Sequence, residues 1–196
     1  MSANDNSVNI ENSGDRYHHG DLRSALVEEG LKRLENGPAE ALSLREVARN
    51  VGVSATAVYR HFPDKAALLR ALTEVGGERI ADAFRVAMAN AKPGKDAFNA
   101  MGRAYVRFAL ANPSLFRLMM SPAVRRGATG EPDSRGMQML ASSLNELSGG
   151  KMSSEEQKIR RLQAWSVVHG LAMLMLDGLV PADDKIIDSV LETRIV

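Results

Sequence analysis

A run of hydrogen-bond donors at Tyr59, Arg60 and His61 could contact the bases and phosphates of DNA. The residues just before them, Ala55 and Thr56, are small. Small side chains at the front of a short helix let it enter the major groove, which is roughly 12 Å wide. The spacing therefore predicts a helix that reads DNA.

Two predicted helices position these donors. Ser43 is a residue type that commonly caps the N-terminus of a helix, and Glu46 three residues later completes a capping-box pattern. Gly52 is suited to the left-handed turn that ends this helix, and Ser54 is suited to cap the next one. The first helix has apolar residues at helical spacing on one face, namely Leu44, Val47, Ala48 and Val51. Residues 43–62 are therefore predicted to form a helix-turn-helix.

The second helix of this motif has an apolar side and a polar side. Val58 and Phe62 are four residues apart, so both are expected to face the core while the donors face outward. An ordinary helical hairpin in a core is the alternative. A second helix of about two turns, with small residues leading and polar residues outside, favours the helix-turn-helix.

The segments Gly52-Val53-Ser54 and 59–65 resemble the DNA-binding domain of the TetR/AcrR family of bacterial repressors. The upstream segment 17–23 agrees with it. Trp165 with His169-Gly170, together with 108–113 and 116–119, resembles the branch whose regulatory domain is named for a Trp-His-Gly signature. The resemblance spans nearly the whole chain from about Tyr17. One departure is that the family often has Thr at the position of Ala57, whereas this chain has Thr56.

The resemblance implies an all-α protein with a three-helix helix-turn-helix domain and a larger C-terminal helical domain for ligand binding and dimerisation. We expect a disordered arm at 1–15, the DNA-binding domain at 16–80 and the regulatory domain at 81–196. The last two long helices are expected to pair with those of a second subunit in a four-helix bundle. The implied function is a cytoplasmic, homodimeric repressor that binds a near-palindromic operator and is released by a small apolar ligand.

Lys65 matches a backbone-phosphate contact of the family, in the first turn of a helix that Asp64 is expected to cap. Arg16 could contact the backbone or the minor groove, although a solvated tail is the alternative. The adjacent His18 and His19 would not share a helix face, which argues against a metal site. The full set of predicted DNA contacts is Arg16, Ser43, Arg45, Ser54, Ala55, Thr56, Tyr59, Arg60, His61 and Lys65.

Composition narrows the possible classes of protein. The chain has 196 residues, a net charge of +1 and no cysteine. The small charge means that any basic footprint for nucleic acid must be local. Absence of cysteine excludes disulfides, thiolate zinc sites and cysteine nucleophiles. The first residues lack the pattern of a signal peptide, and the apolar run 164–176 is shorter than the roughly 20 residues of a membrane span.

Further helices follow from apolar spacing and end signals. Asp21 is expected to cap the first helix, which Gly37-Pro38 ends. A helix from Asp64 to about residue 91 crosses Gly76-Gly77, where a kink and close packing are the two interpretations. The remaining predicted helices are 97–111, a shorter one after Pro113, 134–147, one opening at a Ser153–Glu156 capping box, and one from 183 to the C-terminus, with a loop at 121–133.

An apolar ligand cavity is predicted in the C-terminal domain, and ordinary core packing is the alternative for each of its residues. For Trp165 and His169 we favour packing, because a signature shared by proteins with different ligands is better explained by architecture. The residues that could line the cavity are Phe98, Met101, Tyr105, Phe116, Met119, Trp165, His169 and Met173.

An enzyme is the competing class of function. The sequence shows no nucleophile paired with a base, no paired carboxylates, no HExxH zinc site and no phosphate-binding loop. We therefore expect no catalysis, no cofactor and no metal. A ligand-binding module without DNA binding is the third possibility, and the intact segment 59–65 argues against it.

Overall fold

The computed structural model describes residues 19–122 and 134–193, and within them every regular element is helical. This confirms the all-α prediction. Arg16 and the expected arm at 1–15 lie outside the described residues, as does most of the expected loop at 121–133. The elements are α1 (His19–Glu35), η1 (Ala39–Ala41), α2 (Leu44–Val51), α3 (Ala55–His61), α4 (Lys65–Ala89), α5 (Lys95–Ala111), α6 (Pro113–Met120), α8 (Arg135–Leu147), α9 (Ser154–Leu176) and α10 (Asp184–Glu192).

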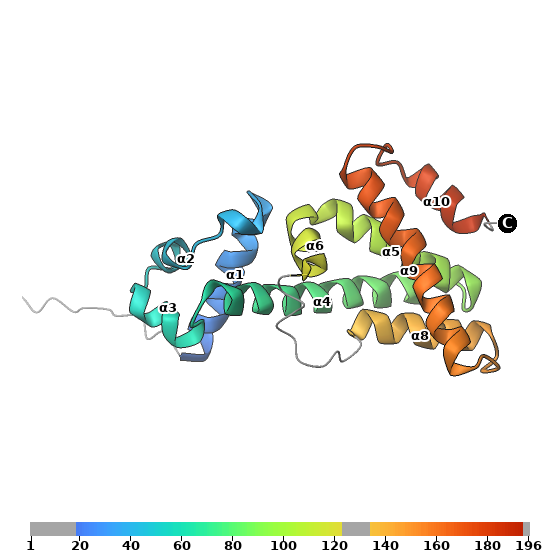
Figure 1. Cartoon of the computed structure of the whole chain (residues 1–196), viewed down its shortest axis with the longest axis horizontal. Helices are drawn as coiled ribbons and strands as arrows, with labels where there is room; N and C mark the ends of the chain where they lie inside the picture. The colour runs from blue at the N-terminus through green and yellow to red at the C-terminus, as the bar shows by residue number, and fades with distance from the viewer. Residues whose placement is uncertain (1–18, 123–133, 194–196) are drawn as a thin grey trace, which may run out of the picture.

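The molecule is elongated, with α1, α2 and α3 gathered at one end and α5, α8, α9 and α10 at the other (Figure 1). The helix α4 runs between the two ends. The expected boundary between the domains at residue 80 falls inside this helix, so α4 belongs to both parts.

The core of the first end is built from the apolar faces of α1 to α4. Val58 and Phe62 are 1% and 2% exposed, which confirms that they face inward. Leu26, Val47 and Leu68 are buried with them. Burying each side chain of this size stabilises the folded state by on the order of 1.5–3 kcal/mol. These contacts anchor the inner face of α3 in the core.

The first helix begins earlier than the sequence indicates. Asp21 was the expected cap, but α1 already begins at His19, so that prediction is wrong. The end of the helix agrees better, because α1 stops at Glu35, just before Gly37 and Pro38. The error is of the size expected for helix ends, which are the least determined part of a helix in a sequence.

No break occurs in α4 at its two glycines, and Figure 1 shows no sharp bend there. A Cβ atom added to Gly76 would lie 2.6 Å from Sδ of Met119 and 3.2 Å from Cδ1 of Leu115, both on α6. Nothing lies within 4 Å of a Cβ added to Gly77. Close packing is therefore the correct interpretation for Gly76, and the kink is not observed.

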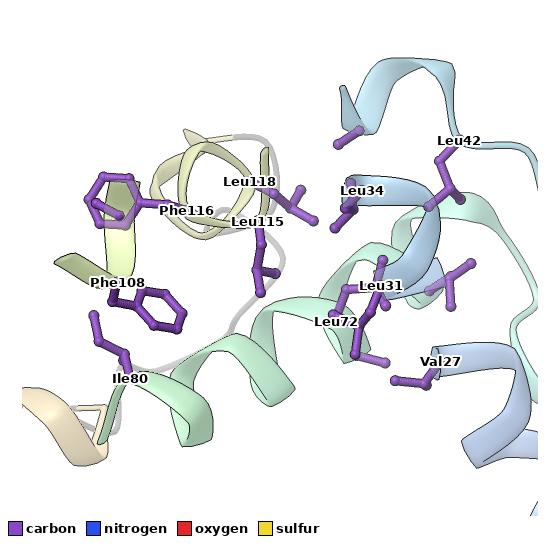
Figure 2. Packing of buried hydrophobic residues seen from close by; sticks show 14 of the residues in the cluster. Val27, Leu31, Leu34, Leu42, Leu72, Ile80, Phe108, Leu115, Phe116 and Leu118 are labelled. Carbon is purple, nitrogen blue, oxygen red and sulfur yellow. The ribbon is translucent and has the colours of Figure 1, made fainter. Parts of the chain in front are cut away.

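The short helix α6 bridges the two ends of the molecule. Leu118 points toward Leu34 of α1, whereas Phe116 points to the opposite side of α6 (Figure 2). Both Leu118 and Phe116 are buried. Contacts of α6 with α1, η1, α4 and α5 make it part of both cores.

The C-terminal helices match the predicted ones closely. The capping box at Ser153 and Glu156 is confirmed, with both reciprocal bonds present. Asp183 caps α10, but α10 has only nine residues, so the expectation of two long final helices is wrong for the second. Within the described residues, no helix combines the length and the apolar content that crossing a membrane requires.

Candidate DNA interface and regulatory core

A tight turn places α3 directly after α2. Gly52 has φ 79° and ψ 26°, a left-handed conformation that glycine adopts without strain, and its N–H donates to the last carbonyls of α2. The side chain of Ser54 accepts a hydrogen bond from the N–H of Ala57 at 3.2 Å. The predicted turn at Gly52 and the predicted N-cap at Ser54 are confirmed.

The predicted capping box at Ser43 is wrong. The Ser43 side chain makes no capping bond, although Ser43 is the N-cap residue. Glu46 instead accepts a hydrogen bond from Arg33 at 3.1 Å, between Oε2 and NH1. Arg33 also donates to Glu29 at 3.3 Å, and Asn50 donates to the same Glu29 oxygen at 2.6 Å. The carboxylate of Glu46 thus holds α2 against α1, which the sequence pattern of α2 alone could not show.

The described members of the predicted DNA-contact set lie at the end of the molecule formed by α2, α3 and the start of α4 (Figure 1). Tyr59 is 45% exposed, so part of its side chain reaches solvent. The exposed members are Arg45, Ser54, Ala55, Thr56, Tyr59 and Arg60, and the half-buried members are Ser43, His61 and Lys65.

Lys65 is held in place at the first residue of α4. Its Nζ donates to the backbone carbonyl of Glu40 at 2.6 Å. Asp64, the residue before it, caps α4 by accepting from the N–H of Ala67 at 2.7 Å, as predicted. An ammonium group has three protons, so the bond to Glu40 leaves donors for a phosphate. The helix N-terminus adds a favourable dipole for an anion at this position.

Arg23 is a residue of this region that sequence reasoning missed. Its guanidinium lies 5.4 Å from the centre of the Phe62 ring, a cation–π geometry. The residues are far apart in the sequence, and no spacing rule connects them. Arg23 therefore helps to fix the end of α3 from α1.

The second cluster, which we call the aromatic core, consists of Phe84, Tyr105, Phe116, Trp165 and His169. The hydroxyl of Tyr105 lies 3.0 Å from Nε1 of Trp165 and 3.0 Å from Nδ1 of His169. The Tyr105 and Phe116 rings meet edge to face at 5.5 Å. Both nitrogens have a partner inside the helical bundle, as the packing interpretation of the signature expects.

Burial shifts the pKa values of two residues in the aromatic core, Tyr105 and His169. It raises the pKa of Tyr105 to about 12, against a smaller lowering by the hydrogen bond from Trp165. It also lowers the pKa of His169, because a charged imidazole is poorly solvated there. Both groups are therefore neutral near pH 7.

The residues predicted to line a ligand cavity lie on α5, α6 and α9, and several form the aromatic core. Met101, Tyr105 and Phe116 are buried, whereas Phe98, Met119, Trp165, His169 and Met173 are half-buried. A surface hollow of about 560 Å³ is bordered by residues of α8 and α9 instead, among them Leu144 and Ile159. A second, of about 300 Å³, borders α1 and α2. Neither hollow is lined by a residue of the predicted set.

Comparison with known proteins gives consistent matches along the chain. Residues 26–72 match the model of "Bacterial regulatory proteins, tetR family", and residues 98–195 match "Tetracyclin repressor-like, C-terminal domain". The Trp-His-Gly branch is not identified by these matches and stays a prediction. The Nucleoid occlusion factor SlmA of Idiomarina loihiensis is 28% identical over 102 residues, which are 52% of each chain. The chain thus spans about half the length of the curated relatives it matches.

Solved structures extend the likeness over almost the full length. A protein of unknown function from Rhodococcus sp. RHA1 is 30% identical, with a TM-score of 0.72 over 91% of this chain and 93% of that one. A TetR family transcription regulator from Marinobacter aquaeolei VT8 shares the fold at 18% identity, with a TM-score of 0.63 over 86% and 91% of the two chains. The helix-turn-helix geometry, the two family matches and this full-length likeness together show that the chain belongs to the TetR family of bacterial transcriptional regulators.

Proposed function

We propose that this protein is a homodimeric repressor that binds a near-palindromic operator and leaves it when a small apolar ligand binds. The observation that carries the proposal is the outer face of α3. Gly52 and Ser54 fix its start, Val58 and Phe62 anchor it, and Thr56, Tyr59 and Arg60 are left exposed. A helix held in this way and presenting small residues first has the properties of a major-groove reader.

A homodimer is supported by the outward face of α9. Ile159, Leu162 and Leu174 are 49%, 59% and 43% exposed, although each is a large apolar residue. Between them lie Ser166 and Gly170, one and two turns after Leu162. Such a row of exposed apolar side chains is costly in water and is typical of an interface.

Gly170 adds a more specific argument. A Cβ atom added to it would meet nothing within 4 Å, so no contact inside the protomer requires a glycine there. Glycine weakens a helix by up to about 1 kcal/mol relative to alanine, and close approach of another helix is a physical reason for it. The apolar residues of α10 contribute less, because Ile187 is only 1% exposed and is used within the protomer.

The row on α9 is self-complementary about its middle. Leu162 and Leu174 lie at equal distances in sequence from the midpoint between Ser166 and Gly170. Two α9 helices crossing antiparallel there would place each Leu162 near Leu174 of the partner subunit, as a two-fold interface requires. Two recognition helices would then contact half-sites about 34 Å apart, one turn of DNA.

Selection of bound duplexes from a random DNA pool tests the proposal directly. We expect an enriched motif with two-fold symmetry and half-sites separated by about one helical turn. A lack of enrichment at low salt would contradict the repressor and favour a ligand-binding module without DNA binding.

A further inference from the structure

Exposed apolar side chains gather around α8, α9 and the turn that follows α9. Among the residues that the structure describes, seven large apolar or aromatic side chains are exposed, and five of them lie in this region. The five are Leu147, Ile159, Leu162, Leu174 and Leu179. Leu179 is the most exposed of them, at 73%, and it lies beyond the row on α9. A group of this kind indicates a surface that is covered in an assembly.

The turn after α9 brings Leu179 back to the side of the helix that carries Leu174. Gly178 has φ 71°, and its N–H donates to the carbonyl of Met175 at 3.1 Å. The N–H of Leu179 donates to the carbonyl of Leu174 at 2.9 Å. These two bonds form a Schellman motif, which places the residue after the glycine beside the residue whose carbonyl it binds. Leu179 therefore continues the exposed row of α9 past the end of the helix.

The hollow of about 560 Å³ between α8 and α9 opens on the same side of α9 as Leu174. Gln163, which borders it, is eleven residues before Leu174, and this spacing of about three turns places both on one face. Leu147 of α8 and Ile159 of α9 also border the hollow, and they are 44% and 49% exposed. An apolar opening thus lies on the face of α9 that meets the partner subunit in the proposed homodimer.

The antiparallel pairing of α9 determines which part of the partner subunit lies at this opening. Leu179 is five residues after Leu174, and Gln157 is five residues before Leu162. A crossing that pairs Leu162 with Leu174 of the partner subunit therefore places Leu179 of the partner subunit level with Gln157, in the part of α9 that borders the hollow. The two-fold axis also brings the same side of each helix together.

The charges at the rim of the hollow fit the same pairing. Arg160 borders the hollow. By the register of the crossing, Asp177 of the partner subunit is level with Ile159, the residue before Arg160. The Asp177 side chain is 44% exposed even though it binds Arg117. Opposite charges would therefore meet at the rim, and no like charges are brought together by this pair.

We propose that the hollow between α8 and α9 of each protomer receives Leu179 of the partner subunit. Leu147 and Ile159 would cover the inserted side chain, which removes three exposed apolar groups from water at once. The occupant is a second copy of this chain, because a two-fold axis supplies one hollow and one Leu179 on each side. The inference rests on the homodimer of the proposed function and adds α8 and the turn after α9 to its interface.

Crosslinking of introduced cysteines tests the contact, because the chain has no cysteine of its own. We expect Ile159→Cys combined with Leu179→Cys to give a covalent dimer of the full chain with a short bismaleimide. Within one protomer most of α9 separates the two positions, roughly 25 Å at 1.5 Å per residue, so the reagent cannot join them there. The matched control is Arg49→Cys with Leu179→Cys, because Arg49 is 74% exposed on α2, at the other end of the molecule (Figure 1). It should give no covalent dimer.

Substitution of Leu179 gives a second, independent measurement. We expect Leu179→Asp to raise the dissociation constant of the dimer at least about tenfold in sedimentation equilibrium, because a charge would enter an apolar hollow. Leu179→Met keeps an apolar side chain of similar volume and should leave the constant within about twofold. Circular dichroism checks that the protomer stays folded, as expected for a residue that is 73% exposed in it.

The outcomes separate this inference from the proposed function. A dimer that forms no covalent product with cysteines at 159 and 179, or a dissociation constant that Leu179→Asp leaves unchanged, would overturn the inference while the homodimer stands. A parent protein that is monomeric at micromolar concentration would contradict the homodimer and the inference together. DNA selection is independent of these measurements, so failure of operator binding is recognised separately.

Discussion

Gly76 of α4 and Met119 of α6 are in such close contact that a methyl group on Gly76 would lie 2.6 Å from the methionine sulfur. The contact joins the helix that spans the molecule to the short helix that touches both of its ends. Sulfur and thioether methylenes can move, but Leu115 lies 3.2 Å from the same position, so the space is bounded on two sides.

We expect Gly76→Ala to destabilise the protein by about 1–3 kcal/mol, the usual cost of overpacking a core. The matched control is Gly77→Ala, where the added methyl group meets nothing within 4 Å. It should stabilise the helix by up to about 1 kcal/mol. Urea unfolding of both variants measures the difference. Equal stability of the two variants would contradict close packing as the reason for Gly76.

The proposed DNA contacts can be distinguished by whether they involve phosphates or bases. Lys65→Ala should weaken binding to all sequences and reduce the salt slope by about one unit, because a phosphate contact is lost. Thr56→Ala should relax the preference at one position in each half-site, whereas Tyr59→Ala should lower affinity without unfolding the protein. Binding titrations at several salt concentrations, with thermal unfolding as the control for folding, measure these effects. An unchanged sequence profile of Thr56→Ala would show that Thr56 does not read bases.

The ion pair between Arg33 of α1 and Glu46 of α2 should help to position the helix-turn-helix. Both side chains are partly solvated, so we expect a coupling free energy of at most about 1 kcal/mol in a double-mutant cycle of Arg33→Ala and Glu46→Ala. Arg49→Ala is the control, because Arg49 lies 4.0 Å from Glu46 and is 74% exposed. Unfolding by urea gives the coupling. A coupling no larger for Arg33 than for Arg49 would show that the link has no structural role.

Local signals determined how much of the fold could be predicted. Gly52 and Ser54 were interpreted correctly, since a left-handed turn and an N-cap depend on residues within one turn. The capping box at Ser43 failed, because Arg33 of another helix competes for Glu46. The residues near Glu46 in the sequence do not indicate that Arg33 would bind it instead.

Interactions across long stretches of sequence could not be predicted. The bond between Trp165 and Tyr105 joins residues 60 positions apart, and the contact of Gly76 with Met119 also joins separate helices. Both depend on how helices pack, for which a single sequence gives only the apolar faces. The predicted cavity residues are a case in point, because their spacing on a helix is the same for a cavity and for a packed core.

The interface on α9 should be sensitive to charge. We expect Leu162→Asp to raise the dissociation constant of the dimer at least about tenfold, since a carboxylate would be buried without a partner. Val86→Asp is the control, because Val86 is 51% exposed on α4, away from this row. Sedimentation equilibrium gives the constants. A parent protein that is monomeric at micromolar concentration would contradict the homodimer.

The antiparallel arrangement of the two α9 helices has its own test. In the proposed crossing, Leu162→Asp combined with Leu174→Lys places opposite charges together across the two-fold axis. The double variant should therefore recover part of the affinity lost in Leu162→Asp. A parallel pairing would place like charges together, and the double variant would then be no better than the single one.

The last prediction concerns the pH dependence of stability. The pKa of His169 is lowered in the folded protein, so below the unfolded value of about 6.5 the unfolded state binds the proton first. The contribution of His169 to the free energy of unfolding should therefore be unchanged above that pH, and the free energy of unfolding should decrease as the pH falls below it. The pKa of Tyr105 is about 12 against 10.0 unfolded, so its contribution should be present below pH 10.0 and lost as the pH rises towards 12.

Two variants show which residue causes the pH dependence of the free energy of unfolding on the acid side and which causes it on the alkaline side. His169→Asn keeps a carbonyl oxygen that can accept from Tyr105, so it should flatten the acid side with little loss of stability near pH 7. Tyr105→Phe should flatten the alkaline side and cost about 1–3 kcal/mol near pH 7, because it leaves the Trp165 N–H without its partner. Urea unfolding across the pH range measures both. An acid slope that survives in His169→Asn would mean that another group, and not the imidazole in the aromatic core, controls the acid stability of this protein.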